Sequence, residues 1–383
     1  MLGPVLAAMT AELQRLGNPS SLHTSGRRVR RVVEESREQL AAAVGAGPSE
    51  VVFTAGGTEA DNLAVKGLFW ARSEADPRRR RVLASAVEHH AVRDSVEWLG
   101  ARAGATLEWL EVDDVGRVRL DAVEAAIRRD PDDVAFVSVM WANNEVGTIQ
   151  PVAELAELAH RYGIPVHSDA VQAFGQIPVD FAASGVDCLA LSGHKIGGPL
   201  GVGALVARRG LGLTPVLHGG GQERGVRSGT LDAPAARGFA LAAALAEGAR
   251  GTQAPRLATL RDDAVAAVLG EVPDAVLRGD PDPAGRLPGN AHFTFPGCEG
   301  DSLLYLLDAR GVECSTGSAC QAGVPQPSHV LLAMGVGEEQ ARGALRFTFG
   351  HTSTTADVEA LAEAIGPVVR RARRAWLATG ARG

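Results

Sequence analysis

The chain has 383 residues, a hydrophobic fraction of 45%, a charged fraction of 22% and a formal net charge of −7 at pH 7. This length accommodates two domains, and the composition is ordinary for a folded globular protein. The negative net charge gives no reason to expect direct binding to nucleic acid, and we interpret the basic run at 78–81 as a solvated loop.

Targeting signals and metal patterns are missing from the sequence. No stretch approaches the roughly 18 apolar residues that cross a bilayer, and the start lacks a secretory pattern, so we expect a cytoplasmic protein without membrane contact. The four cysteines do not suggest a disulfide framework in a chain of this length. They include no Cys-x-x-Cys pair, so we interpret them as reduced thiols and expect no structural zinc.

In its first part the chain alternates helices with short apolar strands. Helices are expected over 1–16 and up to about residue 44, and others begin near residues 59, 91, 120 and 151. The expected strands are 51–55, 81–86, 106–112, 134–140, 164–170, 188–191 and 202–207. Alternation of this kind predicts an α/β fold with a mostly parallel sheet and helices on both of its faces.

A second region follows a long Ala/Leu helix over 234–250. We expect a link at 251–255, which divides a large domain, 1–250, from a smaller C-terminal domain, 251–383. The smaller domain is expected to contain helices up to about 269, over 301–309 and from 355, and strands at 291–295, 312–314 and 345–349. This mixture of short strands and helices predicts an α+β domain.

One lysine lies in an unusual place. The segment Ser192-Gly193-His194-Lys195-Ile196-Gly197-Gly198-Pro199 stands between two apolar runs that read as core strands. Lysine is almost never fully buried unless it is paired, and burial would lower the pKa of its amine and make it nucleophilic, as a Schiff base requires. The alternative is an ordinary loop lysine beside a turn.

Polar side chains collect at the expected carboxyl ends of successive strands, where open α/β sheets bind ligands. Each could be structural alone, but their coincidence favours a shared ligand. They are Thr58, His89, Asn144, Asp169, Gln172, Ser192, His194 and Lys195. The turn Gly56-Gly57-Thr58 also opens a helix whose free N–H groups and dipole favour a phosphate, and the loop from Gly219 to Thr230 could clamp an anion.

A lysine Schiff base needs an electron sink, and pyridoxal 5'-phosphate is the commonest one. Asp169 could pair with its pyridine nitrogen, and His89 could stack on its ring. Gln172 or Asn144 could contact its phenolic oxygen. The candidate phosphate ligands are Thr58, Ser192 and His194, and the candidate for a substrate carboxylate is Arg346.

Cys320 lies in a loop of small residues at 315–323. Such a loop can leave a thiol exposed, and a free thiol with a pKa near ~8.5 is thiolate to a few per cent at neutral pH, which is enough for a nucleophile. The other cysteines, Cys188, Cys298 and Cys314, read as structural residues.

The quoted residues resemble the cysteine desulfurases, which belong to the class V aminotransferase group of fold-type I pyridoxal-phosphate enzymes. The resemblance runs from about Gly17 to about Ile365, and the long loop around Cys320 resembles the group related to iron–sulfur assembly enzymes. It implies a large domain with a mostly parallel seven-stranded sheet. The motifs that carry it are Glu88-His89-His90-Ala91-Val92, Asn143-Asn144-Glu145-Val146-Gly147, Asp169-Ala170-Val171-Gln172, Ser192-Gly193-His194-Lys195, Arg227-Ser228-Gly229-Thr230 and Gly317-Ser318-Ala319-Cys320.

The resemblance implies conversion of L-cysteine to L-alanine with a persulfide left on Cys320. Lys195 would form the internal aldimine and move protons, with His89 as a third catalytic residue. Arg346 and Asn144 would bind substrate. The implied cofactor ligands are Gly57, Thr58, His89, Asn144, Asp169, Gln172, Ser192, His194, Lys195 and Thr230.

The same resemblance implies partners. Thr230 would reach the phosphate of the other subunit in a homodimer. The persulfide would pass to an iron–sulfur scaffold protein or a tRNA-thiolating enzyme, and in a scaffold complex Cys320 could contact a nascent cluster. No resident metal is expected.

Family members usually begin with a short strand and an Asp-x-x-Ala-Thr-Thr-Pro-like segment that approaches the substrate, whereas this chain starts at Met1-Leu2-Gly3-Pro4. Three readings therefore stay open. The first is a cysteine desulfurase, and the second is a selenocysteine lyase or an aminotransferase. The third is a catalytically weak partner or scaffold subunit. Cys320 argues against an ordinary aminotransferase, and its presence beside Lys195 and Asp169 argues against a decayed enzyme.

Overall fold

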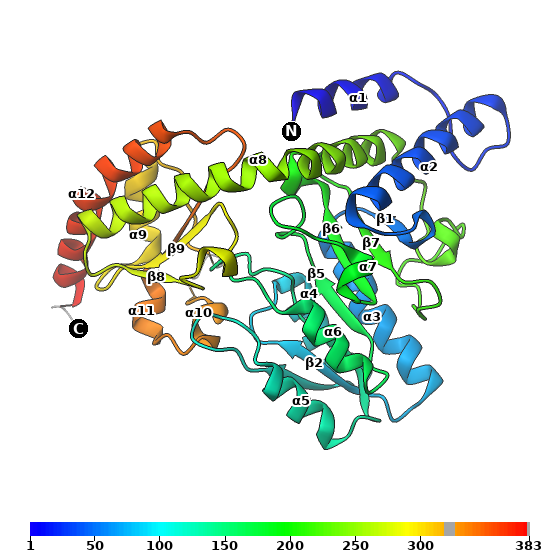
Figure 1. Ribbon diagram of the computed structural model, residues 1–383, viewed down its shortest axis with the longest axis horizontal. Helices are drawn as coiled ribbons and strands as arrows, with labels where there is room; N and C mark the ends of the chain where they lie inside the picture. The colour runs from blue at the N-terminus through cyan, green and yellow to red at the C-terminus, as the bar shows by residue number, and fades with distance from the viewer. Residues whose placement is uncertain (318–325, 381–383) are drawn as a thin grey trace. The chain divides into compact units, whose positions relative to one another are not determined.

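The computed structural model describes residues 1–317 and 326–380 (Figure 1). The chain forms two compact units. The first contains Met1–Leu110, Val118–Trp141 and Gln150–Arg250. The second contains the chain from Gly251 onward together with two short segments, Glu111–Arg117 and Ala142–Ile149, which the sequence analysis did not assign to it. Within the described residues, no helix has the length and apolar character needed to cross a membrane.

Seven strands form the sheet of the first unit, in the order β1-β7-β6-β5-β4-β2-β3. Neighbours from β6 to β3 run parallel, whereas β7 runs antiparallel to both β6 and β1. The mostly parallel sheet that the sequence predicts is therefore confirmed. The strands are β1 (Val51–Thr54), β2 (Arg81–Ser85), β3 (Thr106–Leu110), β4 (Val134–Ser138), β5 (Val166–Asp169), β6 (Cys188–Ser192) and β7 (Gly203–Ala207).

The strands in the middle of this sheet are buried along their whole length. Every residue of β2, β4, β5 and β6 is buried, whereas the edge strand β3 is mostly part-exposed. Continuous apolar runs of this kind are typical of parallel strands covered by helices on both faces. The helices are α1 (Gly3–Leu13), α2 (Thr24–Val44), α3 (Gly57–Ala75), α4 (His90–Ala103), α5 (Leu120–Arg129), α6 (Val152–His160) and α7 (Phe181–Ser184).

Helix α8 (Ala233–Glu271) is continuous, and the division between the two units falls within it, after Arg250. The link expected at 251–255 is therefore helical. Pro255 lies inside the helix, where its ring removes one N–H donor. Beyond it, apolar side chains continue at helical spacing, and Leu257, Leu260 and Ala264 are buried in the core of the second unit. Tertiary burial outweighs the helix-breaking signal of the proline.

The second unit is built on a three-stranded antiparallel sheet in the order β10-β9-β8. Phe293, Leu345 and Phe347 belong to its buried core. The predicted strand at 312–314 does not form, because this part of the chain makes only an isolated bridge between Ser315 and Arg346. The elements are β8 (Val276–Arg278), β9 (Asn290–Thr294), β10 (Ala344–Thr348), α9 (Gly300–Asp308), α10 (His329–Ala333), α11 (Glu338–Arg342) and α12 (Thr355–Gly380).

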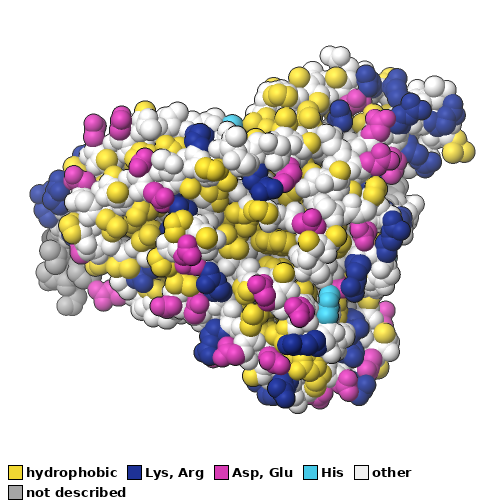
Figure 2. Space-filling view, viewed as in Figure 1, with side chains coloured by type: hydrophobic (Ala, Val, Ile, Leu, Met, Phe, Trp, Pro, Cys, Tyr) yellow, Lys and Arg dark blue, Asp and Glu magenta, His cyan; other side chains and the backbone are white. Residues whose placement is uncertain are grey.

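The basic run at 78–81 is not a solvated loop throughout, contrary to its sequence interpretation. Arg81 is buried at the start of β2, where it donates to Asp133 Oδ1 and Glu108 Oε2, each at 2.8 Å. Exposed basic side chains gather instead over α2, at the upper right of Figure 2. They are Arg27, Arg28, Arg30 and Arg31.

Candidate active site

Lys195 lies in a short 3₁₀ turn, η2 (Gly193–Ile196), between β6 and β7. It is exposed, so the expectation of a buried lysine is wrong. The reason is local: β6 ends at Ser192, and the chain leaves the core before it reaches the lysine. Ser192 Oγ is 2.8 Å from His194 Nδ1, which ties the end of the strand to the side chain that precedes Lys195.

A glycine-rich turn precedes α3 at the end of β1. Gly56 is the N-cap of α3, and no side chain among the described residues caps it by a hydrogen bond. Gly57 is buried, and a Cβ there would lie 2.7 Å from Val171 Cγ2. Thr58 follows in the first helical turn and is exposed. This arrangement leaves helix N–H groups and their dipole open to an anion.

Asp169 ends β5 as a buried carboxylate and accepts from the Val171 N–H at 2.8 Å. Burial raises its pKa, while the charge of His89, the Val171 N–H and the charge of Lys195 act in the opposite direction. The mutual electrostatic effects of Asp169, His89 and Lys195 mean that the three predicted residues lie near one another in the first unit.

His89 is the N-cap of α4, and its Nδ1 accepts from the Ala91 N–H at 3.1 Å. This contact assigns the ring proton to Nε2. Partial burial lowers the pKa of His89; Asp169 opposes this shift, and His90 and Lys195 add to it. The helix cap fixes the orientation of this imidazole.

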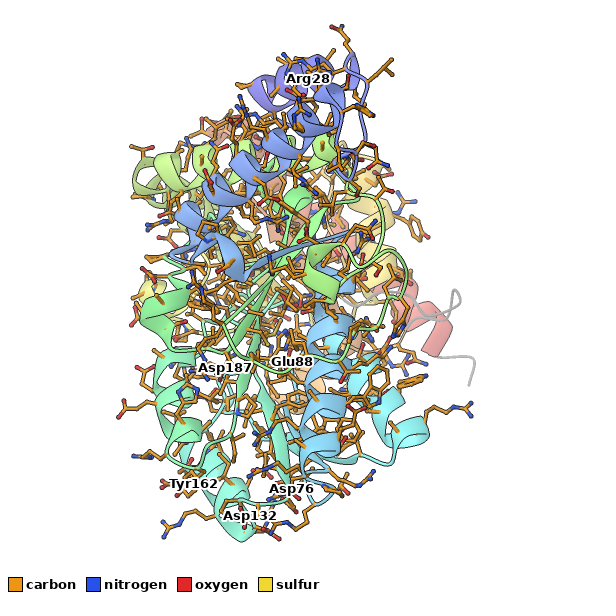
Figure 3. The ribbon with its side chains drawn as sticks, turned by 90° about the vertical axis from the view of Figure 1, so that its right-hand side faces the viewer. Arg28, Asp76, Glu88, Asp132, Tyr162 and Asp187 are labelled. Atoms are coloured by element: carbon orange, nitrogen blue, oxygen red, sulfur yellow. The ribbon has the colours of Figure 1, made fainter. Side chains whose placement is uncertain are left out.

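Two further acids interact electrostatically with Asp169, although the sequence did not single them out as site residues. Asp61 on α3 and Glu88 before α4 are buried, and Glu88 is labelled in the interior in Figure 3. Burial raises the pKa of both carboxyls well above the usual range, and the charge of Asp169 raises them further. His167 separates Asp61 from Ser138: its Nε2 is 3.4 Å from Asp61 Oδ1, and its Nδ1 is 2.9 Å from Ser138 Oγ.

The positions of these two acids in the sequence could have indicated that they are buried near the site. Asp61 stands one turn into a helix of apolar residues, and Glu88 directly precedes His89 in a quoted motif. Burial lowers the pKa of His167 to about 3, so this imidazole is neutral. Burial raises the pKa of all three carboxyls, and for Asp169 the side chains of His89 and Lys195 oppose the rise.

The remaining predicted residues of the first unit occupy its loops. Gln172 follows β5 and is half-buried, and its carbonyl accepts from Gln176 Nε2 at 2.9 Å. Thr230 is exposed at the end of the loop from Gly219. The first unit thus contains Gly57, Thr58, His89, Asp169, Gln172, Ser192, His194, Lys195 and Thr230.

Asn144 and Arg346 belong to the second unit and contact each other. Arg346 Nη1 donates to the Asn144 carbonyl at 2.6 Å. Burial lowers the pKa of Arg346, while Glu145 opposes this shift. The Nε of Arg346 is buried and has no hydrogen-bond partner among residues 1–317 and 326–380. A half-buried guanidinium with a donor that has no partner in the described part of the chain suits a carboxylate ligand.

Cys320 lies outside the described residues, so its proposed role remains a prediction. Of the other cysteines, Cys188 and Cys298 are buried, as structural thiols would be. Burial, with a smaller effect of Asp308, raises the pKa of Cys314 to about 11. That thiol is protonated at neutral pH and is a poor nucleophile.

Comparison with known proteins identifies the family. A model described as aminotransferase class-V matches residues 2–361. The chain is 57% identical to an IscS-like cysteine desulfurase of Mycobacterium tuberculosis, over 97% of this chain and 94% of the relative. It is 41% identical to a cysteine desulfurase IscS of Dictyoglomus turgidum, over 94% and 89% of the two chains.

Solved structures agree with these sequence matches. A NifS-like protein superposes with a TM-score of 0.87 at 33% identity, over 97% of this chain and 96% of the other. A structure described as SspA in complex with cysteine superposes with a TM-score of 0.77 at 31% identity, over 91% and 95%. The chain belongs to the cysteine desulfurases of the aminotransferase class-V family.

Proposed function

We propose that this enzyme is a pyridoxal-phosphate-dependent cysteine desulfurase that converts L-cysteine to L-alanine and accepts the sulfur on Cys320. One observation carries the proposal. Lys195, His89 and Asp169 interact electrostatically in a unit that also contains a glycine-lined helix N-terminus. Relatives that share up to 57% of the sequence are named cysteine desulfurases.

The residues present fit the cofactor. Its phosphate would lie on the N-terminus of α3 with Thr58, Ser192 and His194 as side-chain donors, because Gly57 leaves no Cβ over that surface. Asp169 would pair with the ring nitrogen, and His89 would stack on the ring in the orientation set by its helix cap. Gln172 and Asn144 supply further amide donors. The bound cofactor provides an electron sink for the substrate's α-carbon.

The two further acids support this assignment. Burial raises the pKa of Asp61 and Glu88 well above the usual range, whereas the side chains of His89 and Lys195 oppose the rise for Asp169, which favours Asp169 as the partner of the ring nitrogen. Lys195 is exposed and can move a proton to or from the substrate. Arg346 would hold the substrate carboxylate in a two-bond contact.

The sulfur transfer needs one nucleophile and no external oxidant. The Cys320 thiolate would form an S–S bond as the substrate's C–S bond breaks, and the electron pair of that bond would stay with carbon. A proton then completes L-alanine. The persulfide would be passed to an iron–sulfur scaffold protein or a tRNA-thiolating enzyme, and a homodimer is the proposed assembly.

Alanine release from L-cysteine, measured with pyridoxal phosphate and a dithiol, tests the function. We expect steady turnover by the full chain. Cys320→Ala should keep the cofactor's visible absorbance and lose alanine release, whereas Lys195→Ala should lose the absorbance that borohydride reduction changes. Cys314→Ala is the matched control. It should keep both the cofactor's absorbance and alanine release, because the Cys314 thiol is protonated.

Three results would change the assignment. Normal alanine release by Cys320→Ala would remove that thiol from the reaction. Turnover of L-selenocysteine without turnover of L-cysteine would favour a selenocysteine lyase. A cofactor band with no turnover of either substrate would favour the reading as a weak partner subunit.

A further inference from the structure

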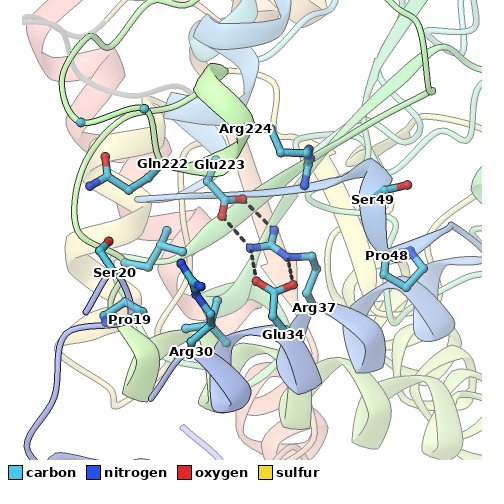
Figure 4. A pocket seen from close by; sticks show the side chains of 14 residues that line it. Pro19, Ser20, Arg30, Glu34, Arg37, Pro48, Ser49, Gln222, Glu223 and Arg224 are labelled. Carbon is cyan, nitrogen blue, oxygen red and sulfur yellow. Dashed lines mark hydrogen bonds and ion pairs between the residues drawn. The ribbon is translucent and has the colours of Figure 1, made fainter. Parts of the chain in front are cut away.

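The loop from Gly219 to Thr230 is held by the buried carboxylate of Glu223, which forms an ion pair with α2 and a hydrogen bond with β1. Arg37 on α2 donates to both carboxylate oxygens of Glu223, at 2.6 and 2.7 Å, and the Phe53 N–H donates to the same carboxylate at 2.8 Å. Figure 4 shows Arg37 between Glu223 and Glu34, beside a cavity of about 630 Å³. Both oxygens of the Glu223 carboxylate therefore accept hydrogen bonds that hold the loop against α2 and β1.

The backbone at this anchor is strained. Glu223 and Arg224 have φ values of 45° and 57°, which place two successive non-glycine residues in the left-handed region. Such strain persists only where the surroundings fix it. The reversal brings the two arms of the loop together: Gln222 Oε1 accepts from the Gly229 N–H at 2.9 Å, and Ser228 Oγ accepts from the Gly221 N–H at 3.2 Å.

A second ion pair connects the same loop to the phosphate cradle, which is the turn Gly56–Thr58 at the N-terminus of α3. Arg227 donates to Glu59 in a two-bond contact, Nε to Oε1 at 2.7 Å and Nη2 to Oε2 at 3.1 Å. Glu59 is in the first turn of α3, and its Oε2 also accepts from the Ala55 N–H at 2.6 Å. The guanidinium that the sequence offers as an anion clamp is thus engaged by a carboxylate of the protein itself.

The charge of Glu59 explains why this pair matters. Burial alone would raise its pKa, but the hydrogen bonds from Arg227 and Ala55 outweigh burial and lower it, so Glu59 is an anion. It follows Thr58 directly, at the helix end that would receive the phosphate. An uncompensated carboxylate there would repel the phosphate. Arg227 supplies the compensating charge and at the same time orients the chain that leads to Thr230.

We propose that Arg227, held by Glu59, is a positioning residue for the cofactor phosphate: the pair cancels the negative charge beside the cradle and fixes the segment that ends in Thr230. The inference rests on the proposed function, because it requires pyridoxal phosphate at this site. The proposed role concerns the phosphate alone. It therefore predicts a change in affinity for pyridoxal phosphate but not for pyridoxal, whereas a general loss of stability would weaken the binding of both ligands.

The test compares two ligands that differ only in the phosphate. Full-length apo-protein is titrated with pyridoxal 5'-phosphate and with pyridoxal, and binding is followed by visible absorbance. For Arg227→Gln we expect the Kd for pyridoxal phosphate to rise about tenfold, because the Glu59 carboxylate beside the phosphate would lose its compensating charge, with the Kd for pyridoxal within about twofold of wild type. Arg78→Gln, which removes an exposed surface ion pair with Asp76, is the control and should change neither Kd.

Further variants separate positioning from folding. Arg227→Lys keeps the charge without the planar fork and should recover part of the lost affinity. Because the two side chains act as a unit, Glu59→Gln with Arg227→Gln should bind pyridoxal phosphate no more weakly than Arg227→Gln alone. Equal weakening of pyridoxal and pyridoxal phosphate, or no weakening of either, would overturn the inference. Absence of a cofactor band in wild type would overturn the proposed cofactor itself.

Discussion

Asp61 is buried, and its raised pKa predicts a pH-dependent contribution to stability. Burial, Asp169 and Glu88 all raise the pKa of Asp61. The folded protein therefore binds this proton more tightly than the unfolded chain, where the pKa of an aspartate is near ~3.9. The stabilisation that the proton provides is complete below that value and is lost as the pH rises toward the raised pKa of the folded state.

Asp61→Asn should become more stable relative to wild type as the pH rises. We expect the difference in apparent Tm between variant and wild-type apo-protein to increase from pH 5 to pH 8 by several degrees, since 1 kcal/mol corresponds to about 2–4 °C for a domain of this size. Asp94→Asn, at an exposed site on α4, is the control. A pH-independent difference for Asp61→Asn would show that the carboxyl is already ionised in the folded protein.

At the residue scale, the sequence predicted which residues are candidates for the site better than it predicted whether their side chains are buried. Residue type and strand-end position were enough to select Lys195 and Asp169 as candidates. Burial could not be read in the same way: Lys195 is exposed, although it stands between core strands, while Arg81 is buried, although it ends a basic run. Burial of a charged side chain depends on partners from distant segments, such as Asp133 and Glu108 for Arg81.

At the scale of elements, strand β7 controls how closely the phosphate cradle approaches the sheet. It begins at Gly203, which pairs with Thr54 and Ser192 at the ends of β1 and β6. A Cβ at Gly203 would lie 2.6 Å from the carbonyl carbon of Gly56 and 2.6 Å from the Leu191 oxygen. Neither backbone atom can move without shifting the turn before α3 or the turn that carries Lys195.

Gly203→Ala should therefore lower both stability and cofactor affinity. Overpacking of this kind costs about 1–3 kcal/mol, and we expect a lower Tm together with a higher Kd for pyridoxal phosphate. In Gly212→Ala the nearest atom to the new methyl group is Ala71 Cβ at 3.4 Å, an ordinary contact, so this control should resemble wild type. Unchanged affinity in Gly203→Ala would mean that the turn adapts without cost.

The elements that sequence patterns predicted best are those with one dominant signal. The apolar run of β4 gave nearly correct bounds, and the helix end expected near residue 44 is the end of α2. Helix α8 was divided because Pro255 and two glycines suggest a break, and β8 was missed because only three residues form it. For α8, burial against segments far along the chain decides the outcome, and no local pattern contains that information.

At the scale of the whole molecule, the resemblance predicts that Thr230 serves the site of the other subunit. Mixed dimers test this. Chains with Lys195→Ala and chains with Thr230→Val are each expected to form weak or inactive dimers. In a mixed dimer, however, the site with an intact Lys195 would receive an intact Thr230 from its neighbour.

Alanine release by purified mixed dimers should thus approach half of the wild-type rate, because one of two sites is complete. Two differently tagged chains, expressed together and purified through both tags, provide the sample. If Thr230 served its own subunit, every site in the mixed dimer would be damaged, and no recovery over the Thr230→Val dimer would be seen. Sedimentation of the wild-type chain checks the dimer itself.

The allocation of Glu111–Arg117 and Ala142–Ile149 to the second unit limits how this protein can be dissected. In that unit Arg117 donates to Asp280, the Asn144 carbonyl accepts from Arg346, and Glu145 accepts from Ser328 at 2.5 Å. A fragment cut at residue 251 would begin in mid-helix and would leave three buried or half-buried polar groups without their partners. Producing the second unit alone would require grafting both short segments onto it, since a contiguous piece of the gene does not encode it.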